Sequence, residues 1–237
     1  MAHYIYGKNV VRQRILSTEK IHRLLLSKNK ADQSFVELAK KHNIPITYLN
    51  DFELKKFSGV HQNVIAEVDD FRYYTLEEVL ATVNDKACFV ILDGIEDPHN
   101  LGAILRSADA AGISAIIIPK HGSVSLNATV AKVSTGAIDT VPTVMVTNLN
   151  QCIDTLKEKG FWIYASDLTD HAQDYRKVKY SEKCALVIGS EGQGISRLVL
   201  KNSDVVVKIP MVGQVTSLNA SVSAALLMYE VLNQRLP

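Results

Sequence analysis

Short apolar runs of strand length, separated by segments with helical spacing, dominate the last two-thirds of this chain. The run 87–92 is uninterrupted by charge, and helical periodicity follows it over 100–111. Further runs of this kind lie at 115–118, 143–146, 161–165, 185–188 and 205–209, and helix candidates lie at 127–133, 149–159, 195–201 and 218–236. Strands that read as continuous apolar runs are typical of parallel sheets covered by helices on both faces. The pattern therefore predicts an α/β domain with a mainly parallel sheet, spanning 77–237.

The last of these helices shows how the pattern is interpreted at the level of single residues. Its apolar side chains fall on one stripe, and Ser217 is available as its N-cap. The stripe contains Leu218, Val222, Ala225, Leu226, Tyr229 and Leu232.

The first part of the chain reads as a separate, smaller α/β unit. Helical spacing over 31–42 and strand candidates at 46–49 and 63–68 predict a domain at 1–67, followed by a linker at 68–76. Residues 1–67 carry 11 Lys or Arg against 6 Asp or Glu, while the remainder carries 15 against 19. This asymmetry is typical of a unit that meets a polyanion, and a solvated lysine-rich surface explains it equally well.

Several classes of protein are disfavoured by what the sequence lacks. The strand at 87–92 leads into DGIEDPHN rather than G-x-G-x-x-G, and no P-loop is present, which disfavours an ordinary dinucleotide fold. No stretch approaches the roughly 20 apolar residues of a membrane span, and no secretory signal is visible. Cys88, Cys152 and Cys184 are scattered, so we expect reduced thiols in a cytoplasmic protein, with no metal site.

Three polar blocks stand where apolar runs end: DPHNLGAILR at 97–106, GSEGQG at 189–194 and IPMVGQVTSLNAS at 209–221. In the first block Pro98 fixes a turn and Asn100 can cap a helix that begins at Leu101. Arg106, two turns on, offers a rigid fork of donors that suits a phosphate, although a surface arginine paired with a carboxylate is the commoner case.

The other two blocks combine glycines with polar side chains. Glycines around Glu191 allow backbone to approach a ligand closely, and an ordinary strand-to-helix turn is the alternative. In the third block four polar residues crowd one helix start, where capping needs a single one, and this indicates a lined pocket. They are Thr216, Ser217, Asn219 and Ser221.

Taken in order, the three blocks resemble the signature of the SpoU (TrmH-like) branch of the SPOUT RNA methyltransferases. That family transfers a methyl group from S-adenosylmethionine to a ribose 2′-hydroxyl of RNA. The resemblance also implies a deep C-terminal trefoil knot and a homodimer formed through this domain. By motif position, the implied cofactor-contacting residues are Gly189, Ile209, Met211, Gly213 and Leu218. The implied catalytic residues are Asn100, Arg106, Glu191, Ser217 and Asn219. In the family proposal the arginine and an RNA phosphate polarise the hydroxyl, often across the dimer interface.

The ends of the first unit resemble the small L30e-like RNA-binding domain of one subgroup of that family. The matching segments are YGKNVV at 6–11 and SGVHQ at 58–62; the usual glycine after His-Gln is Asn63 here, and asparagine tolerates positive φ. The implied RNA-binding residues are Lys8, Arg12, Arg14 and His61.

The resemblance as a whole implies a cytoplasmic RNA 2′-O-ribose methyltransferase, with guanosine in 23S rRNA as the expected substrate. A tRNA methyltransferase and a non-catalytic RNA-binding protein of the same fold are the alternatives. The complete set of polar residues disfavours the second of these, because an inert binder has no need of it.

Overall fold

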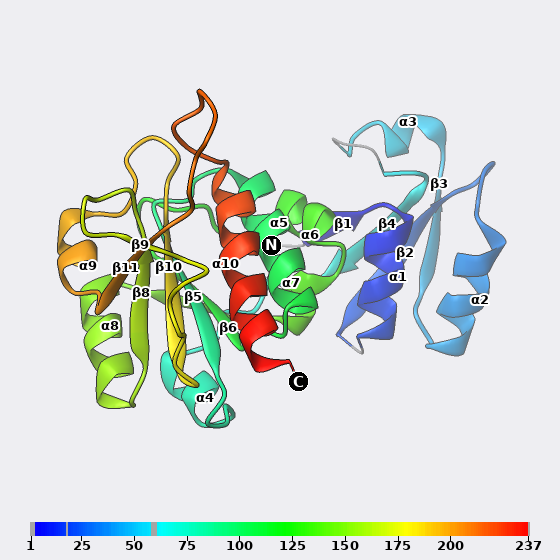
Figure 1. Ribbon diagram of the computed structural model, residues 1–237. Helices are drawn as coiled ribbons and strands as arrows, with labels where there is room; N and C mark the ends of the chain where they lie inside the picture. Colours follow the sequence, from blue (N-terminus) through cyan, green and yellow to red (C-terminus); the bar gives the residue numbers. More distant parts are fainter. Residues whose placement is uncertain (1–2, 18, 58–60, 237) are drawn as a thin grey trace.

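The computed structural model describes residues 3–17, 19–57 and 61–236, which form two sheets side by side (Figure 1). The smaller sheet has four strands in the order β1-β4-β2-β3, and the larger has seven in the order β7-β6-β5-β10-β8-β11-β9. The α/β architecture and the small N-terminal unit predicted from the sequence are confirmed.

The N-terminal unit mixes antiparallel and parallel pairing. Its elements are β1 (His3–Tyr6), α1 (Lys8–Leu16), β2 (Ile21–Ser27), α2 (Gln33–Lys41), β3 (Ile46–Leu49), α3 (Asp51–Leu54) and β4 (Val64–Val68). Strand β4 pairs antiparallel with β1 and β2, and β2 pairs parallel with β3. Helix α2 begins behind the Asp32 cap, two residues after the predicted start at 31, and Asn43 leaves the helical region with φ 54°.

The larger unit alternates strands and helices as predicted. Its first elements are α4 (Leu76–Leu80), β5 (Cys88–Asp93), α5 (Pro98–Ala110), β6 (Ala115–Pro119), α6 (Ala128–Ser134), α7 (Ala137–Thr140) and β7 (Thr143–Val146). They are followed by α8 (Leu149–Glu158), β8 (Trp162–Ser166), β9 (Gln173–Asp174), β10 (Cys184–Gly189), α9 (Arg197–Lys201), β11 (Val205–Lys208) and α10 (Ala220–Arg235). All its strand pairs are parallel, with β5 and β10 adjacent at the centre.

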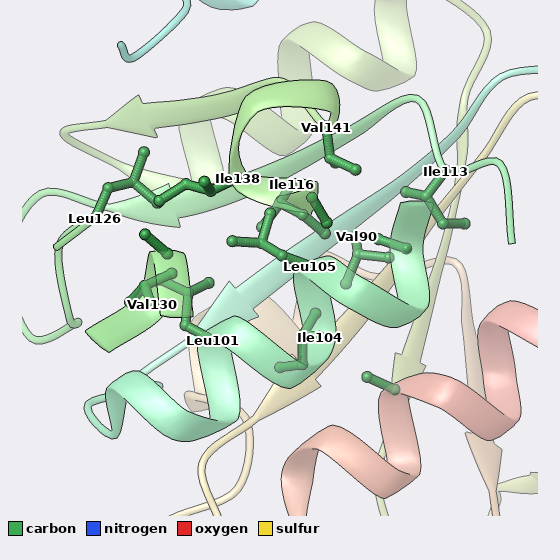
Figure 2. Close-up of a cluster of buried hydrophobic side chains, with 14 of the residues drawn as sticks. Val90, Leu101, Ile104, Leu105, Ile113, Ile116, Leu126, Val130, Ile138 and Val141 are labelled. Carbon is green, nitrogen blue, oxygen red and sulfur yellow. The ribbon is translucent and has the colours of Figure 1, made fainter. Parts of the chain in front are cut away.

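Alternate residues of β5 pack into two different hydrophobic cores, one on each face of the sheet. Val90 and Leu92 pack on the side covered by α5 and α10, and Phe89 and Ile91 pack on the side covered by α8. Figure 2 shows the first of these cores around Leu101, Ile104 and Leu105 of α5. A sheet buried on both faces explains why its strands read as continuous apolar runs.

Two helix starts differ from the sequence prediction. Helix α5 begins at Pro98 behind an Asp97 cap, because a proline suits the first helical turn, so Asn100 lies inside the helix and does not cap it. Helix α10 begins at Ala220 behind Asn219, whose side chain accepts from the amide of Ser221. Ser217 is therefore not the cap of α10.

The predicted stripe on α10 is also not the face that packs into the core. The buried residues are Ala220, Ala224, Leu227, Met228 and Val231. By contrast Val222, Leu226 and Tyr229 are 45%, 36% and 49% exposed. Together with Ala103 and Ser107 of α5 they line an apolar groove on the surface.

The two units pack directly on one another, with β1 against α6 (Figure 1). Arg14 of α1 is buried and contacts the carboxylate of Asp139 in α7. A Cβ on Gly136 would lie 2.8 Å from the Cβ of Gln13, so the backbone at α7 approaches α1 closely. Apolar residues of both units belong to one continuous core.

The boundaries 1–67, 68–76 and 77–237 stay a prediction, and so does the trefoil knot. Within the predicted linker Tyr74 already bridges to Val144 of the larger sheet.

Candidate active site

The polar blocks meet beyond the carboxyl ends of the central strands. The parallel order places the ends of β5, β10, β8 and β11 along one edge of the sheet. The first block follows β5, the second follows β10 and the third follows β11. In an open α/β sheet, this edge next to a reversal of strand order is where ligands bind.

One residue from each block takes part in a triangle of hydrogen bonds. Asn100 donates from Nδ2 to Oε1 of Glu191 at 3.0 Å, and Asn219 donates from Nδ2 to the same oxygen at 2.6 Å. Asn219 also donates to Oδ1 of Asn100 at 2.9 Å, and the amide of Ala220 donates to Glu191 at 3.3 Å. These three side chains are hereafter called the polar triangle. Charge-assisted bonds of this kind fix side chains at the surface.

A cavity of about 220 Å³ lies on one side of Glu191. It is lined by four of the five residues expected to contact a cofactor: Gly189, Ile209, Met211 and Leu218. Ser217 also lines it, whereas Gly213 is exposed and lies outside the lining.

The backbone around the second block is packed too tightly for any side chain at Gly189. A Cβ there would lie 2.2 Å from the carbonyl carbon of Gly194, which itself has φ 67°. The same loop is closed by two bonds between the main chains of Ser190 and Gly194. Glycine at position 189 is thus required by a close backbone approach, the use that the sequence indicated.

Arg106 lies apart from the polar triangle. Six residues of α-helix carry it about 9 Å along and about 240° around α5 from Asn100. Arg106 is exposed and does not line the cavity beside Glu191, whereas its helix neighbours Ala103 and Ser107 line the groove against α10.

The residues expected to bind RNA have other contacts. Lys8 forms an ion pair with Asp32 at 2.7 Å, and Arg12 donates to Ser34 at 3.1 Å and lies over the ring of Phe35. The prediction that Arg14 binds RNA is wrong. Arg14 is 5% exposed and bound to Asp139, so its guanidinium is not on a surface that RNA can reach.

The turn at His61 is built as its sequence suggests. Asn63 has φ 63°, and its amide donates to Nδ1 of His61 at 3.0 Å. The left-handed conformation expected at Asn63 is therefore present, while residues 58–60 of the same motif lie outside the described part of the chain.

The three thiols are buried and free, as expected. Burial raises the pKa of Cys152 to about 12, so this side chain stays a neutral thiol at physiological pH. Cys88 and Cys184 face each other across paired strands, and the contact raises the pKa of Cys88 while lowering that of Cys184.

The sequence interpretation missed one wall of the cavity. Ser166 ends β8, Asp167 and Leu168 follow it, and all three line the pocket beside the second and third blocks. They carry no motif, and the available signal was their position after an apolar strand at the carboxyl edge. Among the described residues no cluster of three or more potential metal ligands occurs, and no helix is long and apolar enough to cross a membrane.

Comparison with known proteins identifies the family of this chain. Residues 87–229 match the SpoU rRNA methylase family, and residues 4–74 match the substrate-binding domain of RNA 2′-O ribose methyltransferases. A TrmH family tRNA/rRNA methyltransferase of Bacillus subtilis (strain 168), YacO, is 44% identical over 99% of this chain and 96% of its own length. A relative from Staphylococcus epidermidis with the same family description is 45% identical over 98% and 95%.

Solved structures agree on the fold. The SpoU methyltransferase AviRb from Streptomyces viridochromogenes aligns with a TM-score of 0.86 at 23% identity, covering 99% of this chain and 90% of that one. A crystal structure of an RNA 2′-O ribose methyltransferase aligns with a TM-score of 0.80 at 28% identity, over 100% and 90%. AviRb has also been solved in complex with S-adenosylmethionine.

The fold and the family match together define an RNA methyltransferase. Within that class, the chain belongs to the SpoU (TrmH) family, with a SpoU methylase domain preceded by the family's substrate-binding domain.

Proposed function

We propose that this protein methylates the 2′-hydroxyl of a ribose in RNA and that the modified nucleotide is a guanosine of 23S rRNA. We further propose that it acts as a homodimer in the cytoplasm. The polar triangle carries the proposal, because it places polar groups of all three blocks beside the cavity that suits the cofactor. The match of residues 4–74 to a ribose methyltransferase substrate-binding domain supports the ribose as acceptor.

S-adenosylmethionine supplies a methyl group already activated by a sulfonium. The protein therefore has to align the acceptor oxygen with that methyl and assist loss of the hydroxyl proton. Gly189, Ile209, Met211 and Leu218 would hold the cofactor, with Ser217 at the rim of the same cavity. The triangle would orient the ribose, since its amide groups are already fixed by Glu191.

Arg106 has a different task in this mechanism. A guanidinium is too basic to act as the base by itself, so we assign it the polarisation of the hydroxyl together with an RNA phosphate. Its position beside the exposed apolar groove of α5 and α10 supports a symmetric dimer through that face. In such a dimer Arg106 of one copy serves the triangle of the other.

The first test is transfer of labelled methyl from S-adenosylmethionine to unmodified 23S rRNA and, separately, to total tRNA. Label in the ribose of a 23S guanosine is the expected result. Label in tRNA alone would keep the chemistry and replace the substrate, and failure to bind the cofactor would overturn the methyltransferase proposal.

Arg106→Ala tests the proposed mechanism. We expect it to abolish transfer while calorimetry shows unchanged cofactor binding, and Arg197→Ala, an exposed arginine on α9, is the matched control. Mixing Arg106→Ala with Glu191→Ala chains should restore about a quarter of wild-type activity, because half the dimers are mixed and each has one complete site. No recovery on mixing would place Arg106 in its own chain's site, and full activity of Arg106→Ala would remove it from the mechanism.

A further inference from the structure

A second and larger cavity, of about 710 Å³, adjoins the cofactor cavity at Glu191. Asn100, Glu191 and Asn219, the polar triangle, form part of its wall. Ser190 and Glu191 line both cavities, so the triangle stands between them. A group in the larger cavity is therefore adjacent to whatever the smaller one holds.

Acidic side chains predominate in this second cavity, which His121 also lines. Four carboxylates line it, and no lysine or arginine does among the described residues. Three of the four are engaged by the protein: Asp93 accepts from the amide of Ser196, Asp97 caps α5, and Glu191 belongs to the triangle. Glu96 is exposed on the wall and has no hydrogen-bond or ion-pair partner in the described part of the chain.

These features restrict what the cavity can bind. A phosphate is disfavoured by the carboxylates, and the ligand must instead present hydrogen-bond donors. Nucleobases that are read by proteins are taken out of the stack and bonded along their Watson–Crick edge. Guanine presents two neighbouring donors there, N1–H and the N2 amino group, which match the two oxygens of one carboxylate. Adenine and cytosine present one amino group, and uracil places its single N–H between two acceptors.

We propose that this cavity receives the nucleobase of the target nucleotide, and that Glu96 selects guanine by accepting from N1–H and N2–H. The proposal rests on RNA methylation as the function and adds a specificity-determining residue to it. A base held against Glu96 would lie beside the polar triangle, because Asn100, Glu191 and Asn219 line the same cavity.

The first experiment needs no methyl transfer. Guanosine and inosine, which differ by the N2 amino group, are titrated by ligand-observed NMR into the protein saturated with S-adenosylmethionine. We expect the wild type to favour guanosine by about tenfold, the scale of one bidentate base contact, and Glu96→Gln to lose that preference. Glu158→Gln, an exposed glutamate on α8, should retain it. No saturable binding of guanosine, or equal affinity for the two nucleosides, would overturn the proposal.

The second experiment measures methyl transfer to the substrate RNA, unmodified and carrying inosine in place of the target guanosine. Inosine should raise KM about tenfold for the wild type and leave KM of Glu96→Gln unchanged, since the variant has already lost the contact. A separate inosine effect that adds to the Glu96→Gln effect would overturn the assignment. If no RNA is methylated, the proposed function fails, while the nucleoside titration still decides what the cavity binds.

Discussion

The two units of this protein use their charged and polar residues in opposite ways. In the N-terminal unit three basic side chains are paired with carboxylates of the protein itself: Lys8 with Asp32 and Arg23 with Glu67 inside the unit, and Arg14 with Asp139 of the larger unit. In the catalytic unit the polar residues of the three blocks gather at one edge of the sheet and stay accessible.

The difference teaches how far a count of charges can be interpreted. A basic sequence does not predict a basic surface, because local geometry decides which side chains meet a carboxylate. Lys28, Lys30 and Lys55 are exposed and form no ion pair within the described chain, so their charges stay available to a polyanion. Polar residues at parallel strand ends are more predictable, since the sheet brings those ends together.

The largest effect should come from the backbone that supports the catalytic edge. Gly189→Ala forces a Cβ to within 2.2 Å of Gly194, and we expect a loss of about 3 kcal/mol or more in stability, with no cofactor binding. Gly192→Ala, in the same loop, meets nothing within 4 Å and should change stability by no more than about 0.5 kcal/mol. Urea unfolding and calorimetry measure both, and a stable, cofactor-binding Gly189→Ala would contradict the close approach.

The next effect tests the buried charges between the units. Arg14→Ala should lower the free energy of unfolding by about 3 kcal/mol, because it leaves the carboxylate of Asp139 buried without its partner. Although Arg14 contacts this carboxylate, burial outweighs the contact and raises the pKa of Asp139. Arg14→Met combined with Asp139→Leu should therefore regain most of the loss in urea unfolding. A double variant as unstable as Arg14→Ala would show that the charges themselves are needed.

Asn219→Ser separates capping from catalysis in the polar triangle. Serine keeps a cap for α10, so stability should change by about 0.5 kcal/mol or less. It removes the amide donors to Glu191 and Asn100, and we expect kcat to fall about 100-fold. Asn148→Ser replaces the equivalent cap of α8 away from the site and should leave kcat unchanged. Equal activity of the two variants would remove Asn219 from the reaction.

The smallest effect concerns an exposed pair of the N-terminal unit. Bonds from Lys8 and Ser34 lower the pKa of Asp32 to about 2. Because this pKa is lowered on folding, the stabilisation is present above the ordinary value near 3.9 and is lost as the pH falls toward 2. NMR titration of the Asp32 carboxyl carbon checks the value, and Lys8→Ala should raise it. An unchanged midpoint in that variant would show that the pair does not form in solution.

The part of the fold that the sequence predicted well is the larger sheet, whose strands all carry the same signal, a short apolar run. Six apolar runs between 87 and 209 became strands within a residue or two, because a buried parallel strand requires apolar residues at every position. β1, α1 and β2 were missed, since they mix polar and apolar residues and are stabilised by partners distant in sequence. β1, for example, pairs with β4, which joins Tyr6 to Ile65.

The sequence by itself determined the α/β alternation, the family and the residues of the polar blocks, because these depend on local composition and short spacings. Tertiary structure alone decided that Asn100, Glu191 and Asn219 meet. Asn100 is 91 residues from Glu191 in the sequence, and Asn219 is 28 residues from it. It also decided that Arg14 is buried and that Tyr229 is exposed. The physical reason is the same in each case: the environment of a side chain is set by packing between segments far apart in the chain, which no local pattern records.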